Sequence, residues 1–264
     1  MSTNTNAIWF LVGVVLMVIF GRLLVRAALL KGPMRGPSRA NVGFEARHLL
    51  VAAVITGCLI PVLAYLVLRW SGIAHVDARV NALFEPFRTP WLLEIFVQVT
   101  SMGTIFSMSV IVVIVSSLLW SMGRLAMLVP LWSSFLGAEV TTWAIKYGID
   151  RVRPDFLQGI TESNPSFPSG HATATTVVIG FIGFIIAREL PTRSLRIEVG
   201  FWSAMVIIAV CLSRLFLSLH YLSDVLCGFL VGSFWLLIGV ASIRRQLSAN
   251  GDAYKGHRCP GSIE

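Results

Sequence analysis

Residues 198–242 read EVGFWSAMVIIAVCLSRLFLSLHYLSDVLCGFLVGSFWLLIGVAS, two apolar segments with a short polar string between them. An α-helix needs about 20 apolar residues to cross the hydrocarbon core of a membrane. The segments 198–213 and 221–242 are close to that length, and the string SRLFLSLHYLSD, residues 213–224, places an Arg, a His and an Asp where they meet. The stretch therefore predicts two membrane-spanning helices with ionisable groups at a shared end.

The composition of the whole chain is that of a membrane protein. Hydrophobic residues make up 56% of the 264 residues and charged residues 13%, against about 25% charged residues in an ordinary soluble domain. The formal net charge of +8 does not indicate nucleic-acid binding, because the basic residues lie in short loops between apolar spans, where they set membrane topology. Seven candidate spans follow, at 7–30, 48–69, 103–120, 125–145, 171–188, 198–213 and 221–242.

We predict an all-α, polytopic transmembrane bundle with an N-terminal anchor and cytoplasmic linker (1–47), a transmembrane domain (48–243) and a disordered cytoplasmic tail (244–264). The first span has a competing interpretation as a secretory signal peptide. Its clean apolar run ends near Phe20, and Arg22 and Arg26 follow. The preceding MSTNTN carries no basic side chain, and no A-x-A cleavage site is evident. We therefore favour a retained helix whose two arginines extend toward the interface.

The distribution of Lys and Arg predicts the orientation. With seven spans, twelve basic residues fall on one side of the membrane and seven on the other. The positive-inside rule makes the richer side cytoplasmic. The amino terminus and the polar strings described below then face the periplasm or the cell exterior, and the carboxyl tail is inside. We expect the membrane to be the inner (plasma) membrane of a bacterium.

Residues 71–102 connect the second and third predicted spans. Apolar residues recur there at helical spacing from Val76 to Phe87, with Asp77, Arg79, Asn81 and Glu85 between them. This pattern suggests an amphipathic helix on the membrane surface, with Trp70 and Trp91 as interface anchors. An ordinary extracellular loop helix is the alternative.

The four cysteines show no metal or disulfide pattern. They are Cys58, Cys211, Cys227 and Cys259, and none has CxxC spacing. Three lie in apolar segments, so we interpret them as small buried apolar residues.

The string KYGIDRVRP, residues 146–154, carries two cations suited to binding a phosphate. Lys146 lies where the fourth span leaves the membrane, and Arg153 follows seven residues later. Arg offers a planar fork to phosphate oxygens and Lys a point charge, although both could be mere interfacial anchors. Within the string we expect Asp150 to be a solvated loop residue and Arg151 to be at most an extra phosphate contact.

The string PSGH, residues 168–171, opens the fifth span. A turn that begins a helix offers backbone N–H groups to an anion, helped by the helix dipole. Gly170 allows close approach of the anion, and the Ser169 hydroxyl can donate as well. His171 would lie at the rim, suited to proton transfer. The alternative is a capped helix with an interfacial His.

The third string adds Arg214, His220 and Asp224. His220 and Asp224 are four residues apart and share a helix face, so the carboxylate can accept a hydrogen bond from one imidazole nitrogen and leave the other free to attack. Ionisable groups beside hydrocarbon are expensive unless they are used, which disfavours a mere surface pair. Glu139, inside the fourth span and two turns before Lys146, could position Lys146 or be a neutral hydrogen-bonded carboxyl.

Taken together, the three strings resemble the signatures of the type 2 phosphatidic acid phosphatase superfamily. Lys146 with Arg153-Pro154 matches the first, Pro168-Ser169-Gly170-His171 the second, and Ser213-Arg214 with His220 and Asp224 the third. The match covers roughly residues 75–242. The apolar spans argue against the soluble vanadium haloperoxidases of the same superfamily.

The resemblance implies a six-helix membrane core, with segment 7–30 as an additional helix. It implies that His220 is the nucleophile and forms a phosphohistidine, that Asp224 orients it, and that His171 protonates the leaving oxygen and then activates water. Lys146, Arg153, Arg214, Ser169 and the Gly170 N–H would hold the phosphoryl oxygens. No metal or other cofactor is expected, and the sequence has no carboxylate cluster suited to Mg²⁺.

Three functions remain open from the sequence. The first is a metal-independent hydrolase acting on a lipid-linked phosphate or diphosphate, such as a polyprenyl diphosphate, phosphatidic acid, phosphatidylglycerophosphate or a lipid A phosphate. The second is a phosphotransferase that passes the same phosphoryl group to a lipid acceptor. The third, a transporter or receptor for lipid phosphates, would need the cations but not the His220–Asp224 pair. No protein partner and no nucleic acid are expected.

Overall fold

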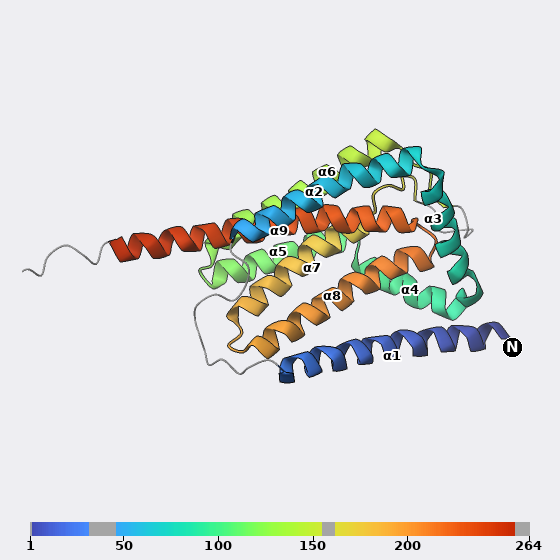
Figure 1. Ribbon diagram of the computed structural model, residues 1–264, viewed down its shortest axis with the longest axis horizontal. Helices are drawn as coiled ribbons and strands as arrows, with labels where there is room; N and C mark the ends of the chain where they lie inside the picture. Colours follow the sequence, from blue (N-terminus) through green and yellow to red (C-terminus); the bar gives the residue numbers. More distant parts are fainter. Residues whose placement is uncertain (1, 32–45, 155–161, 257–264) are drawn as a thin grey trace, which may run out of the picture.

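The structure is a computed structural model that describes residues 2–31, 46–154 and 162–256, and no strand occurs in these ranges. The helices are α1 (Ser2–Lys31), α2 (Ala46–Arg69), α3 (Ser71–Phe84), η1 (Glu85–Phe87), α4 (Pro90–Met102), α5 (Ile105–Ser121), η2 (Leu125–Met127), α6 (Leu128–Ile149), α7 (Gly170–Glu189), α8 (Arg193–Phe216) and α9 (Leu222–Gly256). Most of the helices run along one long axis, and α3 runs across one end of the bundle (Figure 1).

The described helices confirm the predicted transmembrane bundle. Five of them, α2, α6 with η2, α7, α8 and α9, are long and apolar enough to cross a membrane, and α4 with α5 adds a sixth span bent by 45°. The third span therefore starts at Pro90, where the sequence predicted a connection. The break falls at Gly103, where a Cβ would clash with the Val210 side chain and come within 3.0 Å of the Thr175 hydroxyl. The lack of a side chain at Gly103 allows this close packing.

α1 is the additional N-terminal helix. Its described apolar part, Thr5–Leu16, is shorter than a full span, and the Arg26 side chain lies outside the described ones. The Phe10 ring packs against those of Phe84, Phe87 and Phe216. The Phe216 ring in turn stacks on Phe96, with 4.2 Å between the ring centroids. This cluster joins α1 to η1, α4 and α8 at the end of the bundle where α3 lies (Figure 1).

The outer surface of the bundle is apolar. On α2, Val54 is 63% exposed and Ile55 57% exposed, although buried positions are where such residues normally lie. Cys58, predicted to be buried, is exposed on the same helix, and none of the described cysteines forms a disulfide; Cys259 lies outside the described residues. A continuous apolar exterior fits a bundle whose solvent is lipid.

Two glycines bring α7 and α9 into backbone contact. A Cβ at Gly228 would clash with the Ser169 carbonyl, and one at Gly232 would come within 2.7 Å of the Thr173 carbonyl. Small residues one turn apart let membrane helices approach closely in this way. The start of α7 is consequently held directly against the first turns of α9.

α3 is an amphipathic helix, as expected within residues 71–102, and its polar face lies inside the protein. Its polar residues Asp77 and Asn81 are 2% and 7% exposed, whereas Val76 and Leu83 are 51% and 67% exposed. The polar face points into the protein because partners lie there: Arg151 from the loop after α6 and Ser223 of α9 bind Asp77, and Ser218 binds Asn81. Its apolar face is left for the membrane interface.

The C-terminal part of α9 also differs from the expectation. We predicted a disordered tail from residue 244, yet the helix continues to Gly256. Extending an existing helix costs far less than starting one, and Arg244 through Ala249 contain no helix breaker. Residues 257–264, and 32–45 of the predicted linker, lie outside the described residues.

Candidate active site

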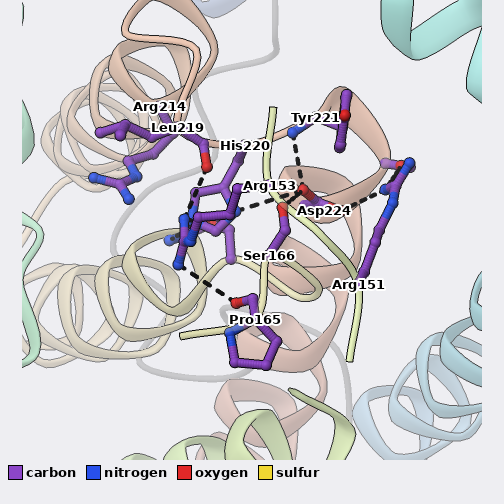
Figure 2. A network of polar contacts seen from close by, with 12 residues as sticks. Arg151, Arg153, Pro165, Ser166, Arg214, Leu219, His220, Tyr221 and Asp224 are labelled. Atoms are coloured by element: carbon purple, nitrogen blue, oxygen red, sulfur yellow. Dashed lines mark hydrogen bonds and ion pairs between the residues drawn. The ribbon is translucent and has the colours of Figure 1, made fainter. Parts of the chain in front are cut away.

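The three polar strings converge at one end of the bundle. The loop after α6 brings Arg151 and Arg153, the first residues of α7 bring Gly170 and His171, and the short link between α8 and α9 brings His220 (Figures 1 and 2). α6 ends in Asp150, which is exposed and adopts the left-handed conformation with φ 49°, as a solvated C-terminal residue can. After this turn, Arg153 reaches the link between α8 and α9, where it donates to the Leu219 carbonyl.

A cavity lies between these strings, with about 450 Å³ of empty space when the part open to solvent is included. Its polar lining comes from Lys146, Arg153, Glu162, Asn164, His171 and His220, together with Glu139 and Thr142 deeper along α6. Ile105 and Trp143 form an apolar part of the wall. Both imidazoles thus face one space, as the sequence predicted.

A chain of polar contacts links the two histidines across the cavity. Arg153 Nη1 lies 3.1 Å from His220 Nε2, and Arg214 Nη1 lies 3.4 Å from His171 Nε2. The Glu162 carboxylate joins the two arginines, with Oε2 at 2.8 Å from Arg153 and Oε1 at 2.5 Å from Arg214. Arg214 is 1% exposed, so a cation held here needs an anion between the arginines.

The electrostatics of the loops reflect this arrangement. Burial, followed by the positive charges of Arg214, Arg153 and Lys146, lowers the pKa of His220 well below its ordinary value, so the imidazole is neutral near pH 7. Burial alone would raise the pKa of Glu162, but Arg214 and Arg153 outweigh it and bring the pKa to about 2. Glu162 is therefore a permanent carboxylate between two permanent cations.

Asp224 lies close to His220 (Figure 2) and is not among the residues that line the cavity. Its Oδ2 is 3.5 Å from His220 Nδ1, which has no hydrogen-bond partner in the described residues. That oxygen accepts hydrogen bonds from the Ser166 hydroxyl and the Tyr221 N–H, and Oδ1 pairs with Arg151 at 2.5 Å. The predicted pairing of Asp224 with His220 is close in space, but the carboxylate is held chiefly by three other groups.

The predicted phosphate ligands are placed unevenly. Lys146 and Gly170 line the cavity, and a Cβ on Gly170 would meet nothing nearer than Thr142 at 4.0 Å. Lys146 donates to the Pro165 carbonyl. Ser169 is fully buried, and its hydroxyl accepts from the Ala172 N–H as the N-cap of α7. Capping satisfies a helix N–H group, so in this structure the Ser169 hydroxyl serves α7 instead of the cavity.

Arg151 has a different place from the one expected. Its guanidinium pairs with Asp224 and with Asp77 of α3, at 2.5 Å and 2.9 Å, and lies over the Tyr221 ring at 4.3 Å. Arg151 is absent from the cavity lining. It supports Asp224 rather than a phosphate.

Sequence reasoning missed Glu162, Asn164, Ser166 and Asp77. The first three precede PSGH in a loop with no helical or strand pattern, where Asn164 accepts from Arg153. A Glu nine residues before His171, close to three cations in sequence, was the available signal. Asp77 gave none, because its α3 contacts residues more than 70 positions away.

Glu139, left unassigned from the sequence, lines the inner part of the cavity. It is 8% exposed, and its Oε1 has no hydrogen-bond partner among the described residues. A metal site is a separate question. The described ranges contain no group of three or more His, Cys, Asp or Glu side chains placed to hold a metal ion.

Known proteins resemble this chain in fold and in sequence. Residues 126–247 match the model of the PAP2 superfamily. Phosphatidylglycerophosphatase B of Bacillus subtilis (strain 168) is 31% identical over 169 residues, 61% of this chain and 80% of that protein. The crystal structure of a transmembrane PAP2 type phosphatidylglycerolphosphate phosphatase from B. subtilis superposes with TM-score 0.66 at 24% identity, over 75% of this chain and 96% of that one. The crystal structure of Aquifex aeolicus LpxE superposes with TM-score 0.50 at 17% sequence identity, over 64% of this chain and 95% of that one.

A spanning helix bundle with two imidazoles and a group of cations around one cavity defines an integral membrane hydrolase with the means to act on a phosphate. The chain belongs to the PAP2 superfamily. The two superpositions establish the fold.

Proposed function

We propose that the protein hydrolyses a lipid-linked phosphate through a phosphohistidine on His220. The supporting observation is that His220 and His171 face one cavity, each next to an arginine, with Lys146 on the same wall. A binding protein would need the cations but not a buried neutral imidazole backed by a carboxylate.

In the first step, His220 Nε2 attacks phosphorus while the bond from phosphorus to the lipid oxygen breaks. His171 gives a proton to that leaving oxygen. The Asp224 carboxylate, 3.5 Å from Nδ1, stabilises the positive charge that develops on the His220 ring. Lys146, Arg153, Arg214 and the Gly170 N–H bind the equatorial oxygens, whose negative charge is the main electrostatic task in phosphoryl transfer.

In the second step, His171 takes a proton from water, whose oxygen attacks the phosphohistidine. The bond between phosphorus and Nε2 breaks, and inorganic phosphate leaves. Every proton is accounted for by His171, which acts as acid and then as base.

The substrate is a membrane lipid bearing a terminal phosphate. The cavity has an apolar wall of Ile105 and Trp143. These residues lie on α5 and α6, which both belong to candidate spans, so a headgroup can enter from the bilayer. The similarity to a phosphatidylglycerophosphatase B puts a phosphatidylglycerophosphate-type lipid first, with a polyprenyl diphosphate, phosphatidic acid and lipid A phosphates as the other candidates.

The site faces the periplasm or exterior of a bacterial inner membrane. In Figure 1 the amino-terminal end of α1 lies at the end of the bundle where α3 runs, and α9 ends at the opposite side. The predicted excess of Lys and Arg belongs to the side where α9 ends. A phosphotransferase using the same phosphohistidine is the alternative.

The deciding experiment measures phosphate release by purified protein across a panel of these lipids, with excess EDTA and with added lipid acceptors. We expect release from at least one lipid, undiminished by EDTA, and loss of about 10³-fold or more in His220→Ala. Full activity in His220→Ala would remove the nucleophile assignment. Transfer to an acceptor in place of release would identify the phosphotransferase.

A further inference from the structure

Asp77 is a fully engaged carboxylate outside the three polar strings. It lies on α3, which precedes the stretch 126–247 that matches the family model. Its side chain is 1% exposed. Oδ1 accepts from the Ser223 N–H at 3.0 Å, and Oδ2 accepts from the Ser223 hydroxyl at 2.6 Å and from Arg151 at 2.9 Å. A buried carboxylate with this many hydrogen-bond and ion-pair partners is fixed in place.

Arg151 connects Asp77 to Asp224. One guanidinium nitrogen, Nη2, binds Asp77, and the other, Nη1, binds Asp224 Oδ1 and the Ser223 hydroxyl, at 2.5 Å and 2.8 Å. The guanidinium plane rests on Tyr221. Because both of its terminal nitrogens are bound and one of its faces is covered, the Arg151 guanidinium is fixed in one orientation.

The order of charges is therefore Asp77 negative, Arg151 positive, Asp224 negative, and then His220. An unshared Arg151 would draw the charge of Asp224 toward Oδ1, away from the oxygen that faces His220 Nδ1. Asp77 takes up part of the Arg151 charge and leaves more on Oδ2. It also holds the first turn of α9 through Ser223, where a carboxylate is favoured by the helix dipole.

We propose that Asp77 and Arg151 are positioning residues for the reaction, which fix the place and the charge of Asp224 from α3. The inference rests on the proposed roles of His220 and Asp224. It makes α3 a part of the active-site support and not only a surface helix.

The test compares Asp77→Asn, Arg151→Gln and the double variant in phosphate-release kinetics. Asn keeps the shape and an oxygen acceptor for the Ser223 N–H, so the fold is retained. We expect Asp77→Asn to lower kcat about 10-fold with KM within about twofold, because the support of Asp224 weakens while Asp77 itself is not part of the cavity lining. Arg151→Gln leaves two buried carboxylates without a cation between them, and we expect a loss of about 100-fold.

The double variant carries the decisive result. Removing the Asp77 charge relieves the repulsion that Arg151→Gln creates, so the double variant should be more active than Arg151→Gln alone, by about 5- to 10-fold. A purely structural role predicts that the two losses add. An unchanged kcat in Asp77→Asn, or a double variant no better than Arg151→Gln, would overturn the proposal.

Two controls separate the causes. Arg79→Gln removes a charge from an exposed position of the same helix and should leave kcat unchanged. His220→Ala tests the proposed function itself: if it stays active, the reaction chemistry is wrong, whereas an inactive His220→Ala beside a normal Asp77→Asn rejects only the positioning role.

Discussion

Glu162 lies between Arg153 and Arg214, the two arginines proposed to bind phosphate, and its removal gives the sharpest test of that proposal. Its carboxylate pairs with Arg153 and Arg214 at 2.8 Å and 2.5 Å. Substrate or inorganic phosphate must displace it to reach these arginines. We therefore expect Glu162→Gln to bind phosphate more tightly than the wild-type protein.

The magnitude follows from the contacts that are lost on displacement. A hydrogen bond between charged groups contributes about 1.5–3 kcal/mol. Because the Glu162 side chain is 30% exposed, we take the lower end for one net contact, about 1.5 kcal/mol, which corresponds to roughly a 10-fold change in affinity. The inhibition constant of inorganic phosphate should fall by about that factor.

The assay is competitive inhibition of lipid phosphatase activity by inorganic phosphate from pH 5 to 8. Because the pKa of Glu162 is about 2, the carboxylate stays ionised over this range, and the difference between wild type and variant should not depend on pH. Glu162→Asp keeps the charge and should resemble the wild type. Glu85→Gln removes an exposed carboxylate from η1 and should change nothing. An inhibition constant that rises or stays constant in Glu162→Gln would show that Glu162 orients the arginines and does not compete with phosphate.

Two further results are expected. Asp224→Asn should lose about 10²–10⁴-fold in kcat while its thermal unfolding midpoint in detergent stays near that of the wild type; wild-type turnover would refute the support of His220 by Asp224. Stability should also fall as the pH drops below about 6.5, by up to ~1.4 kcal/mol per pH unit, because His220 takes up a proton when unfolded but, with its pKa lowered by burial, not when folded. Unfolding midpoints compared between pH 7.5 and 5 should show a shallower slope in His220→Asn, and equal slopes would contradict a neutral buried His220.

The sequence predicted the spans and the meeting of the polar strings for a clear physical reason. Apolar length and the expense of placing ions in hydrocarbon are local properties of the chain. Lys146, Arg153, Gly170, His171 and His220 could be assigned to one site because each lies at the end of an apolar run.

The support of the site was out of reach of the sequence. Whether Arg151 binds a phosphate or a carboxylate depends on α3, which folds onto it from 74 positions away. The hydroxyl of Ser169 is committed to its own helix, a competition that spacing does not reveal. The amphipathic pattern of residues 71–84 does not reveal that the polar side faces inward, because its partners Arg151, Ser218 and Ser223 are remote in sequence.

The backbone contact of α7 with α9 through Gly228 and Gly232 has a consequence for substrate range. It holds the start of α7, which carries His171, against the start of α9, which follows His220. The spacing between these two segments is therefore fixed and cannot increase for a bulkier headgroup. Differences in headgroup size must then be accommodated by the apolar wall of the cavity, which Ile105 and Trp143 form. Relatives that handle different lipids can diverge there and keep the reacting atoms in register.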